Sequence, residues 1–246
     1  MDKNLGKRQL RTIDELVEHF VSNQEQFRRT LKSIQGYIDS SEKLKSLIHS
    51  VKSRIKDPEH LKDKLIRKAI EARESKKPFS YNQGNLFSKI NDLAGYRIIH
   101  LHTRQFQEID SELRKIFEEE QWFIVEGPSA KTWDDESRSY FQQIGVRVSE
   151  SPNMYTSVHY IIKPNSSSKL TCEIQVRTLM EEVWGEVDHA INYPHKSEIY
   201  SIREQIKVLA RVTSSCSRLV DTIFSTHNEN DSIKVGEKPS KLRKGR

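Results

Sequence analysis

Residues 171–189 change their hydrophobic period halfway along, and this change limits how the rest of the chain can fold. The first half alternates, so a strand would carry apolar residues on one face and Glu173, Gln175 and Arg177 on the other. After Thr178 the apolar residues follow helical spacing, which predicts an amphipathic helix with Thr178 as N-cap and Glu181 as its capping-box partner. An acid, an amide and a guanidinium beside a helix N-terminus could build a polar site, although a solvated edge strand would show the same pattern.

Length and charge favour a globular protein with anionic partners. The chain has 246 residues and a formal net charge of +6, which suits nucleotides, phosphates or RNA, although much of the excess sits at the two ends. Cys172 and Cys216 lie far apart in unlike contexts, so we expect reduced thiols in a cytoplasmic protein. No apolar run approaches the roughly 20 residues of a membrane helix, and no signal segment opens the chain, so no membrane partner is expected.

Helices are predicted towards both ends of the chain. They cover residues 12–36, ended by Gly36, then 41–52, then a segment that begins at Asp57 as N-cap, and finally 198–224. The last helix has near-heptad spacing, with Ile206, Val212 and Leu219 inward, so it would pack on the body or on a second subunit of a homo-oligomer. Residues 227–246 are polar and basic, and we expect them to be disordered.

The middle of the chain is mostly β. Strands are predicted at residues 92–101, 122–125, 144–148, 156–162 and 170–177, with one helix at 103–119 between the first two. Residues 126–143 are expected to be a loop that could contain a strand. Helices, a β-rich middle and further helices together predict an α+β fold around one mixed sheet.

Two of these segments carry groups suited to phosphate chemistry. Arg54, Lys56 and Lys64 surround a predicted helix start and could hold a polyphosphate, although a solvated basic helix would show the same charges. Asp92 and Glu173 lie on two strands and offer the oxygen ligands that Mg²⁺ prefers when it binds with substrate phosphates. Cations and Mg²⁺ together suit phosphoryl or pyrophosphoryl transfer.

Four segments, in this order along the chain, resemble the synthetase domain of the RelA/SpoT family. They are residues 54–64, Asp-Leu-Ala-Gly-Tyr-Arg at 92–97, Tyr-Thr-Ser-Val-His-Tyr at 155–160, and Glu-Ile-Gln-Val-Arg-Thr at 173–178 with Trp184 and Asp188-His189 after it. Nothing resembles the family's hydrolase domain, so the chain is similar to the small, single-domain alarmone synthetases. We divide it into a helical segment (1–40), a synthetase domain (41–195), a C-terminal helix (196–226) and a tail (227–246).

The resemblance implies a nucleotidyltransferase-like fold, with a mixed β-sheet flanked by helices. It also implies transfer of the β,γ-pyrophosphate of ATP to a 3′-hydroxyl, usually of GDP or GTP, which makes (p)ppGpp and releases AMP. On the donor side, Arg54, Lys56, Lys64 and Arg97 would bind ATP, and Asp92 would be a catalytic ligand of Mg²⁺.

On the acceptor side, the resemblance implies that Tyr155 stacks on the guanine, a contact worth about 1–3 kcal/mol per base. His159 would meet the acceptor's phosphate or sugar, and Gln175 would position the acceptor. Glu173 would be the catalytic base or metal-linked carboxylate. This role is reasonable because a 3′-hydroxyl is a poor nucleophile that benefits from a carboxylate within hydrogen-bond reach.

Several positions depart from the family's pattern. His60 stands where Ser is usual, and Glu182 stands where Asp or Asn is commoner. The acceptor loop, usually Lys-Pro-Asn-Gly-Tyr, here begins with Ser151 and has Met154 before its tyrosine. A phosphate-binding lysine and a flexible glycine are therefore missing, and the donor half is better supported than the acceptor half.

The altered loop leaves three interpretations. The first is an alarmone synthetase that uses GDP or GTP. The second is the same chemistry on the 3′ end of tRNA, which would make the protein a translation-blocking toxin, in need of an antitoxin, with strongly salt-dependent RNA binding. The third is a catalytically inactive module that binds nucleotides or RNA, against which the intact Asp92 and Glu173 argue.

Overall fold

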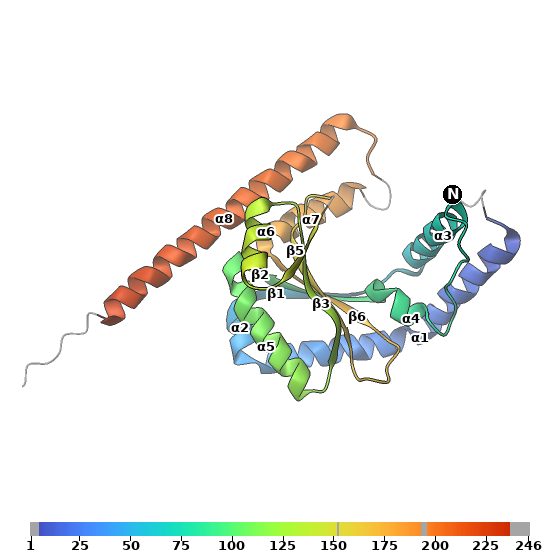
Figure 1. Ribbon diagram of the computed structural model, residues 1–246, viewed down its shortest axis with the longest axis horizontal. Coiled ribbons are helices and arrows are strands. Elements are labelled where there is room, and N and C mark those ends of the chain that lie inside the picture. Colours follow the sequence, from blue (N-terminus) through green and yellow to red (C-terminus); the bar gives the residue numbers. More distant parts are fainter. Residues whose placement is uncertain (1–4, 152, 193–195, 237–246) are drawn as a thin grey trace, which may run out of the picture.

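Six strands form one mixed sheet at the centre of the molecule (Figure 1). The computed structural model describes residues 5–151, 153–192 and 196–236. In spatial order, the strands are β1 (Ile48–Ile55), β2 (Ala94–His100), β6 (Cys172–Thr178), β5 (Ser157–Lys163), β3 (Phe123–Thr132) and β4 (Arg147–Glu150). The pairs β2–β6 and β3–β4 are parallel, and the other pairs are antiparallel. The predicted α+β fold with one mixed sheet flanked by helices is confirmed.

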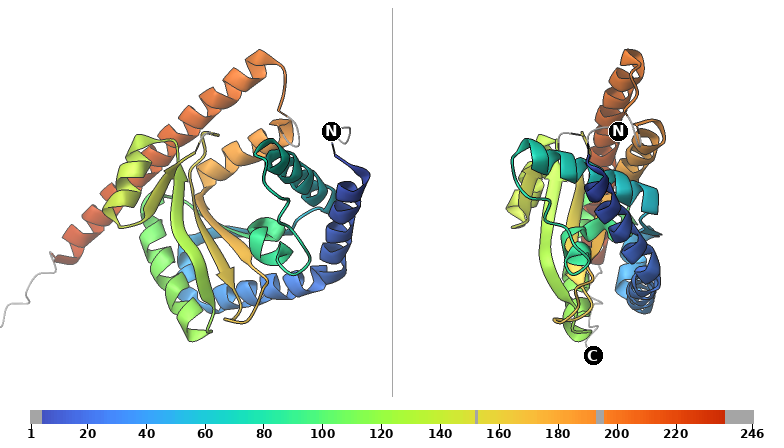
Figure 2. Two further views of the ribbon diagram at one scale, coloured as in Figure 1. Left: turned by 45° about the vertical axis from the view of Figure 1, so that its right-hand side comes forward. Right: turned by 90° about the vertical axis from the view of Figure 1, so that its right-hand side faces the viewer.

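Helices cover both sides of this sheet (Figure 2). They are α1 (Lys7–Ser40), α2 (Glu42–Leu47), α3 (Pro58–Glu74), α4 (Leu86–Lys89), α5 (Phe106–Glu119), α6 (Asp135–Gln143), α7 (Leu179–Asn192) and α8 (Tyr200–Gly236), with short 3-10 turns at Asn91–Leu93 and Thr103–Gln105. α1 and α5 lie on one side and α7 and α8 on the other. Within the described residues, no helix combines the length and apolar character that crossing a membrane requires.

The alternation of the strands decides which helix lies on which face. One face is apolar and is covered by α1 and α5, whose buried residues join those of the sheet in a single core. Two tyrosines on this face are fully buried, and each hydroxyl finds an acceptor on a helix. Tyr96 donates to Gln35 of α1 at 2.7 Å, and Tyr160 donates to Asp110 of α5 at 2.6 Å. The polar side chains of β6 therefore point to the opposite face, towards α7.

The expected helix at residues 41–52 is wrong beyond Leu47, where the chain enters β1. Leu44, Leu47, Ile48 and Val51 have helical spacing, but β1 pairs with β2 along almost its whole length. This pairing outweighs the local preference, because strand formation depends mainly on packing against neighbouring strands. Asp57 is the N-cap of α3, as predicted, and accepts hydrogen bonds from the backbone of Glu59 and His60 at 2.9 and 3.2 Å.

Residues 126–143 do contain a strand, the end of β3, but most of the remainder is helix α6 rather than the expected loop. Register shifts between Ile124 and Ser129 interrupt the alternation that would have revealed the strand. Asp134 caps α6 by accepting a hydrogen bond from the backbone of Ser137 at 2.9 Å. The strand expected at 144–148 begins later, at Arg147.

Both terminal helices are longer than predicted. Gly36 does not end α1, because Ile34 and Ile38 on either side of it are buried, and this packing offsets a cost of about 1 kcal/mol for glycine. α8 runs to Gly236, so residues 227–236 are helical rather than disordered, and 237–246 lie outside the described residues.

The predicted inner face of α8 is only partly correct. Ile206 is buried, but Val212 and Leu219 are more than half exposed, at 51% and 61%. The face that packs on the body instead buries small polar residues, which are Thr213, Ser214 and Ser217.

Two glycines give a matched test of the backbone. Gly127 in β3 has a φ of +104°, and a Cβ there would lie 2.4 Å from the carbonyl oxygen of His159. We expect Gly127→Ala to lower the free energy of unfolding by about 1–3 kcal/mol, measured by urea denaturation. Gly36→Ala, where a Cβ meets nothing within 4 Å, should raise it by about 0.5–1 kcal/mol. Equal stability of Gly127→Ala and the wild type would contradict the steric argument.

Candidate active site

The polar face of β6 forms the shared wall of three adjoining cavities. We name them after the element at the far side of each. The β1 cavity has a volume of about 370 Å³, and its lining includes Arg54, Arg97, Asp92 and Glu173. The α8 cavity, of about 440 Å³, is lined by residues that include Tyr155, Trp184, Gln175 and Arg203. The β3 cavity, of about 360 Å³, is lined by residues that include Lys64, Lys131, Asp92 and Glu173. Most of the side chains singled out from the sequence therefore meet in one region.

Asp92 lies just before β2, beside the strand that carries Glu173. Its two oxygens accept hydrogen bonds from Lys56, at 2.9 Å, and from Lys64 on α3, at 2.8 Å. Burial alone would raise the pKa of Asp92, but the two ammonium groups lower it to about 2. Three residues predicted to act together are thus in contact, and in this arrangement both lysines are paired with the carboxylate.

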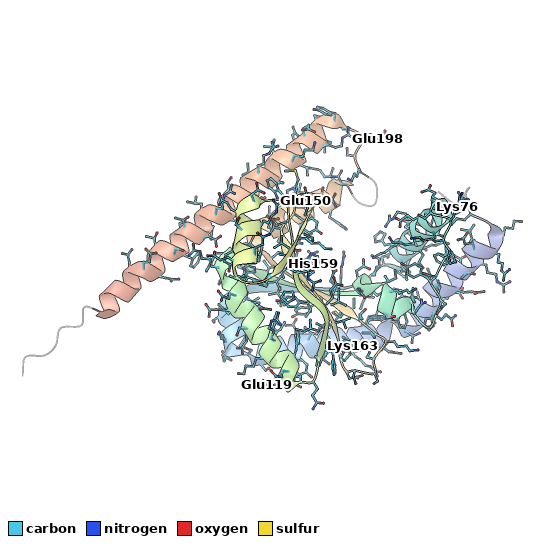
Figure 3. The ribbon with its side chains drawn as sticks, in the orientation of Figure 1. Lys76, Glu119, Glu150, His159, Lys163 and Glu198 are labelled. Atoms are coloured by element: carbon cyan, nitrogen blue, oxygen red, sulfur yellow. The ribbon has the colours of Figure 1, made fainter. Side chains whose placement is uncertain are left out.

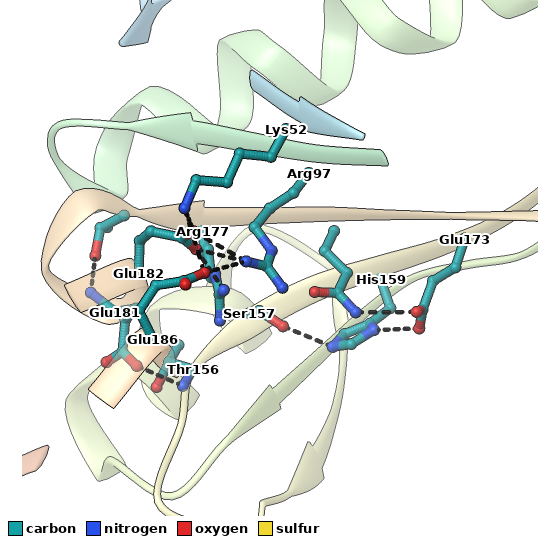
Figure 4. A network of polar contacts seen from close by, with 12 residues as sticks. Lys52, Arg97, Thr156, Ser157, His159, Glu173, Arg177, Glu181, Glu182 and Glu186 are labelled. Carbon is teal, nitrogen blue, oxygen red and sulfur yellow. Dashed lines mark hydrogen bonds and ion pairs between the residues drawn. The ribbon is translucent and has the colours of Figure 1, made fainter. Parts of the chain in front are cut away.

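Glu173 is held by two neighbours on the same face of the sheet (Figure 4). One oxygen accepts a hydrogen bond from Nδ1 of His159 at 2.8 Å, and the other accepts one from Gln175 at 2.9 Å. Because a carboxylate only accepts, Nδ1 carries the proton, and in the neutral ring Nε2 accepts from the hydroxyl of Ser157 at 2.6 Å. Burial favours the neutral acid, but the hydrogen bond and electrostatic interaction with His159, together with the hydrogen bond from Gln175, outweigh it, so the pKa of Glu173 is lowered. Glu173 is therefore ionised at neutral pH.

Glu182 of α7 is buried among cations from three strands (Figure 4). It pairs with Lys52 of β1 at 2.8 Å, with Arg97 of β2 at 2.9 Å, and with Arg177 of β6. Burial opposes its charge, but these partners lower the pKa of Glu182 to about 2. Gly185, one turn further on, makes room for this cluster, because a Cβ there would lie 2.7 Å from the guanidinium of Arg177.

Tyr155 stands at the end of the acceptor loop, residues 151–156, and faces the α8 cavity. Its ring is stacked with Trp184, with centroids 6.4 Å apart and planes at 22°. Met154, beside it, has a φ of +56°, so the residue that replaces the family's usual glycine keeps a left-handed backbone. Ser151 is buried, with 3% of its surface exposed, and its backbone N–H donates to Thr132 at 3.1 Å. Met154 thus keeps the left-handed backbone, while the loop lacks its usual lysine.

Three cations on the strands of this region were given no binding role from the sequence. Lys52 lines the β1 cavity but lies in the strand misinterpreted as a helix. Lys131 lines the β3 cavity, has no ion-pair partner among the described residues, and lies in the segment interpreted as a loop. Arg177 lines both the β1 and α8 cavities, and its place on the polar face with Glu173 and Gln175 was the signal that could have identified it.

The carboxylates fit a divalent cation only together with a ligand. Among the described residues, no group of three or more His, Cys, Asp and Glu side chains could hold a metal ion. Asp92 and Glu173 supply oxygen donors in adjoining positions, but each is already engaged by protein groups. This donor set fits Mg²⁺, which usually takes one or two protein carboxylates and completes its shell with waters and substrate phosphates.

Residues 53–198 match a family model described as the region found in RelA / SpoT proteins. The chain belongs to the RelA/SpoT family. The matched segment contains Asp92, Glu173 and Tyr155, together with Arg54 and Arg97 of the β1 cavity, so the resemblance drawn from four short segments is confirmed. No curated protein sequence matches the chain significantly.

Solved structures show the same fold as this RelA/SpoT protein. A GTP pyrophosphokinase family protein from Streptococcus pneumoniae is 18% identical, with 89% of this chain and 96% of that chain covered and a TM-score of 0.61. Small alarmone synthetase 1 from Bacillus subtilis is 16% identical, with 88% and 99% covered and a TM-score of 0.56. Its structure bound to its product pppGpp is 17% identical, with 87% and 96% covered and a TM-score of 0.54. At these identities the likeness concerns the fold.

Glu182 and Glu186 are the two acids of α7 that face these cations, and their substitution should differ sharply in its effect on stability. Glu182→Gln leaves three neighbouring cations without their buried partner, and we expect the free energy of unfolding to fall by about 3–5 kcal/mol. Glu186→Gln removes a carboxylate that is 54% exposed, although it also pairs with Lys52 and Arg97, and should cost less than about 1 kcal/mol. Urea denaturation of both variants would test this difference, which similar losses would refute.

Proposed function

We propose that this protein transfers the β,γ-pyrophosphate of ATP to the 3′-hydroxyl of GDP or GTP, producing ppGpp or pppGpp and AMP. The observation that carries the proposal is the position of Glu173. Its carboxylate is kept ionised by His159 and Gln175. It lines both the cation-lined β1 cavity and the β3 cavity, and it lies close to the aromatic α8 cavity. A base placed between a site for phosphates and a site for a nucleobase suits transfer between two nucleotides.

The β1 cavity is the proposed site of ATP. Arg54 and Arg97 line it, and Lys56 and Lys64 stand at Asp92 on its edge. Fixed cations in a partly closed cavity stabilise the charge that develops on phosphate oxygens during transfer. Asp92 and Glu173 would hold Mg²⁺, which when bound would neutralise phosphate charge. The ammonium groups of Lys56 and Lys64, which now neutralise Asp92, would then pair with phosphates.

The α8 cavity is the proposed site of the acceptor. Tyr155, supported by Trp184, offers a flat face on which guanine can stack. His159 and Gln175 were expected to touch the acceptor itself. Since both hydrogen-bond to Glu173, we propose that they orient this base, and both also line the acceptor's cavity.

The reaction needs one proton acceptor and a site that stabilises the leaving group. The 3′-oxygen of the acceptor forms a bond to the β-phosphorus of ATP as its proton passes to Glu173. The bond between this phosphorus and the oxygen that bridges to the α-phosphate breaks, and the electron pair leaves with AMP. The lowered pKa of Glu173 keeps it unprotonated and ready at neutral pH.

A nucleic-acid acceptor is the second candidate, and the cations of the α8 cavity suit it as well as they suit GTP. Lys196, Arg203 and Lys207 are exposed and line the α8 cavity together with Tyr155. Such a group of cations could pair with the phosphates of a tRNA 3′ end as well as with the 5′-phosphates of GTP. A terminal adenosine carries no 5′-triphosphate, so the missing lysine at Ser151 would matter less for this acceptor.

One experiment separates these candidates. The protein would be incubated with γ-³²P-labelled ATP, Mg²⁺ and either GDP, GTP or deacylated tRNA, and the products separated by chromatography and gel electrophoresis. Label on GDP or GTP would establish an alarmone synthetase. Label on tRNA alone would replace it with the second candidate, and no label on any acceptor, from folded protein, would refute both.

The two carboxylates should be essential for transfer. We expect Glu173→Gln and Asp92→Asn each to lower kcat by about 10²-fold or more, because one removes the proton acceptor and the other the charge that holds the cation. Glu119→Gln, at the end of α5 far from His159, is the control and should keep the wild-type rate (Figure 3). A near wild-type kcat in either site variant would exclude that residue from the reaction.

Tyr155 should affect only the acceptor. Tyr155→Ala removes the stacking face and should raise the KM for the acceptor about 5- to 150-fold, with the KM for ATP unchanged. Tyr155→Phe keeps the ring and should stay close to wild type. Steady-state kinetics with each substrate varied in turn would test this, and an unchanged acceptor KM in Tyr155→Ala would eliminate the stacking role.

A further inference from the structure

Glu181 of α7 is a buried acid that takes no part in the reaction as proposed. Its expected role was to complete a capping box at Thr178. Its backbone N–H does donate to the hydroxyl of Thr178, at 3.3 Å, but its carboxylate crosses to the acceptor loop instead. There one oxygen accepts a hydrogen bond from the backbone N–H of Thr156 at 2.9 Å (Figure 4). The residue has only 5% of its surface exposed.

This hydrogen bond fixes the backbone directly after Tyr155. The other end of the acceptor loop is attached to β3, through the backbone of Ser151 and Thr132. Thr156 also makes a hydroxyl contact with Thr132 at 2.8 Å. α7 therefore holds this end of the loop twice, with Glu181 on the backbone of Thr156 and with Trp184 against the ring of Tyr155.

We propose that Glu181 is a positioning residue that sets the orientation of Tyr155 and thereby the affinity of the α8 cavity for the acceptor. This inference rests on the proposed function, because it concerns the cavity to which that function assigns the acceptor. Without Glu181, the N–H of Thr156 would be buried without a partner, a state that a small backbone movement relieves. Such a movement would turn Tyr155 away from Trp184, while the β1 cavity, which is lined neither by Glu181 nor by the acceptor loop, would be unchanged.

The surroundings of Glu181 make its charge sensitive to pH. Burial raises the pKa of Glu181 to about 7, although the Thr156 N–H and Arg177 favour the charged form, and Asp134 disfavours it. Glu181 also borders a cavity of about 240 Å³ under α8, and the other ionisable groups that line this cavity are His100, Arg104, Glu136, Tyr140, Arg177, Arg218 and Asp221. Since an ionised carboxylate accepts a stronger hydrogen bond, the loop should be held better as pH rises through about 7.

The test compares three variants of the full chain. Glu181→Gln keeps an acceptor for the Thr156 N–H but not the charge, and should raise the acceptor KM about 2- to 10-fold. Glu181→Met removes the acceptor and should raise it about 5- to 100-fold. Thr178→Ala weakens the cap of α7 without removing the carboxylate, so it controls for general loosening of the helix and should leave the acceptor KM unchanged.

Two readouts distinguish positioning from a purely structural role. The KM for ATP should stay at the wild-type value in every variant. Between pH 6 and pH 8 the acceptor KM should fall in the wild type and stay flat in Glu181→Gln, with the pH range chosen around the pKa of about 7. Equal increases in both KM values, or identical pH profiles of the wild type and Glu181→Gln, would overturn the proposal even if Glu181→Met failed to fold.

Calorimetric binding of GDP separates this inference from the proposed function. If the wild type transfers nothing but binds GDP, and Glu181→Gln binds it more weakly, then the function fails and the positioning role stands. If the wild type transfers pyrophosphate, and Glu181→Gln and Glu181→Met both bind GDP with wild-type affinity, the positioning role fails and the function stands. Absence of GDP binding by the wild type would reject the positioning role as stated.

Discussion

The burial of Glu182 among three cations is the constraint on which the rest of the site depends. Lys52, Arg97 and Arg177 come from β1, β2 and β6, so one carboxylate on α7 joins the helix to three adjacent strands. Without it, three positive charges would lie close together in a partly buried place, where like charges repel strongly. The buried carboxylate of Glu182, with the exposed Glu186 beside it, therefore stabilises the cationic wall of the β1 cavity in the absence of a nucleotide.

The sequence predicted the centre of the sheet better than its edges. β2, β5 and β6 have clear alternation or continuous apolar runs because their neighbours on both sides require it. β1 and β4 are edge strands, and β3 next to β4 is irregular, so their patterns are set by pairing with distant residues. Helical spacing of Leu44, Leu47 and Val51 could not reveal that Val51 pairs with Ile98.

For the site, the sequence could identify residues but not their partners. The resemblance named Asp92, Lys56 and Lys64 as members of one site, yet their mutual ion pairs follow from how α3 packs beside β2. The same holds for Glu181, whose local pattern favours a capping box with Thr178. Its carboxylate bonds to Thr156 because the loop before β5 happens to pass the first turn of α7, a fact that belongs to tertiary structure.

The parallel pairing of β2 with β6 also bears on how the protein reaches its native state. Gly95 and Glu173 are register partners although most of the sheet's other strands lie between them in the chain. Closing so long a loop is entropically costly, and folds rich in such contacts form slowly. Asp92 and Glu173 thus approach one another only when this long-range contact forms, so a chain that lacks it would contain the individual cations and acids without the arrangement that gives them a joint function.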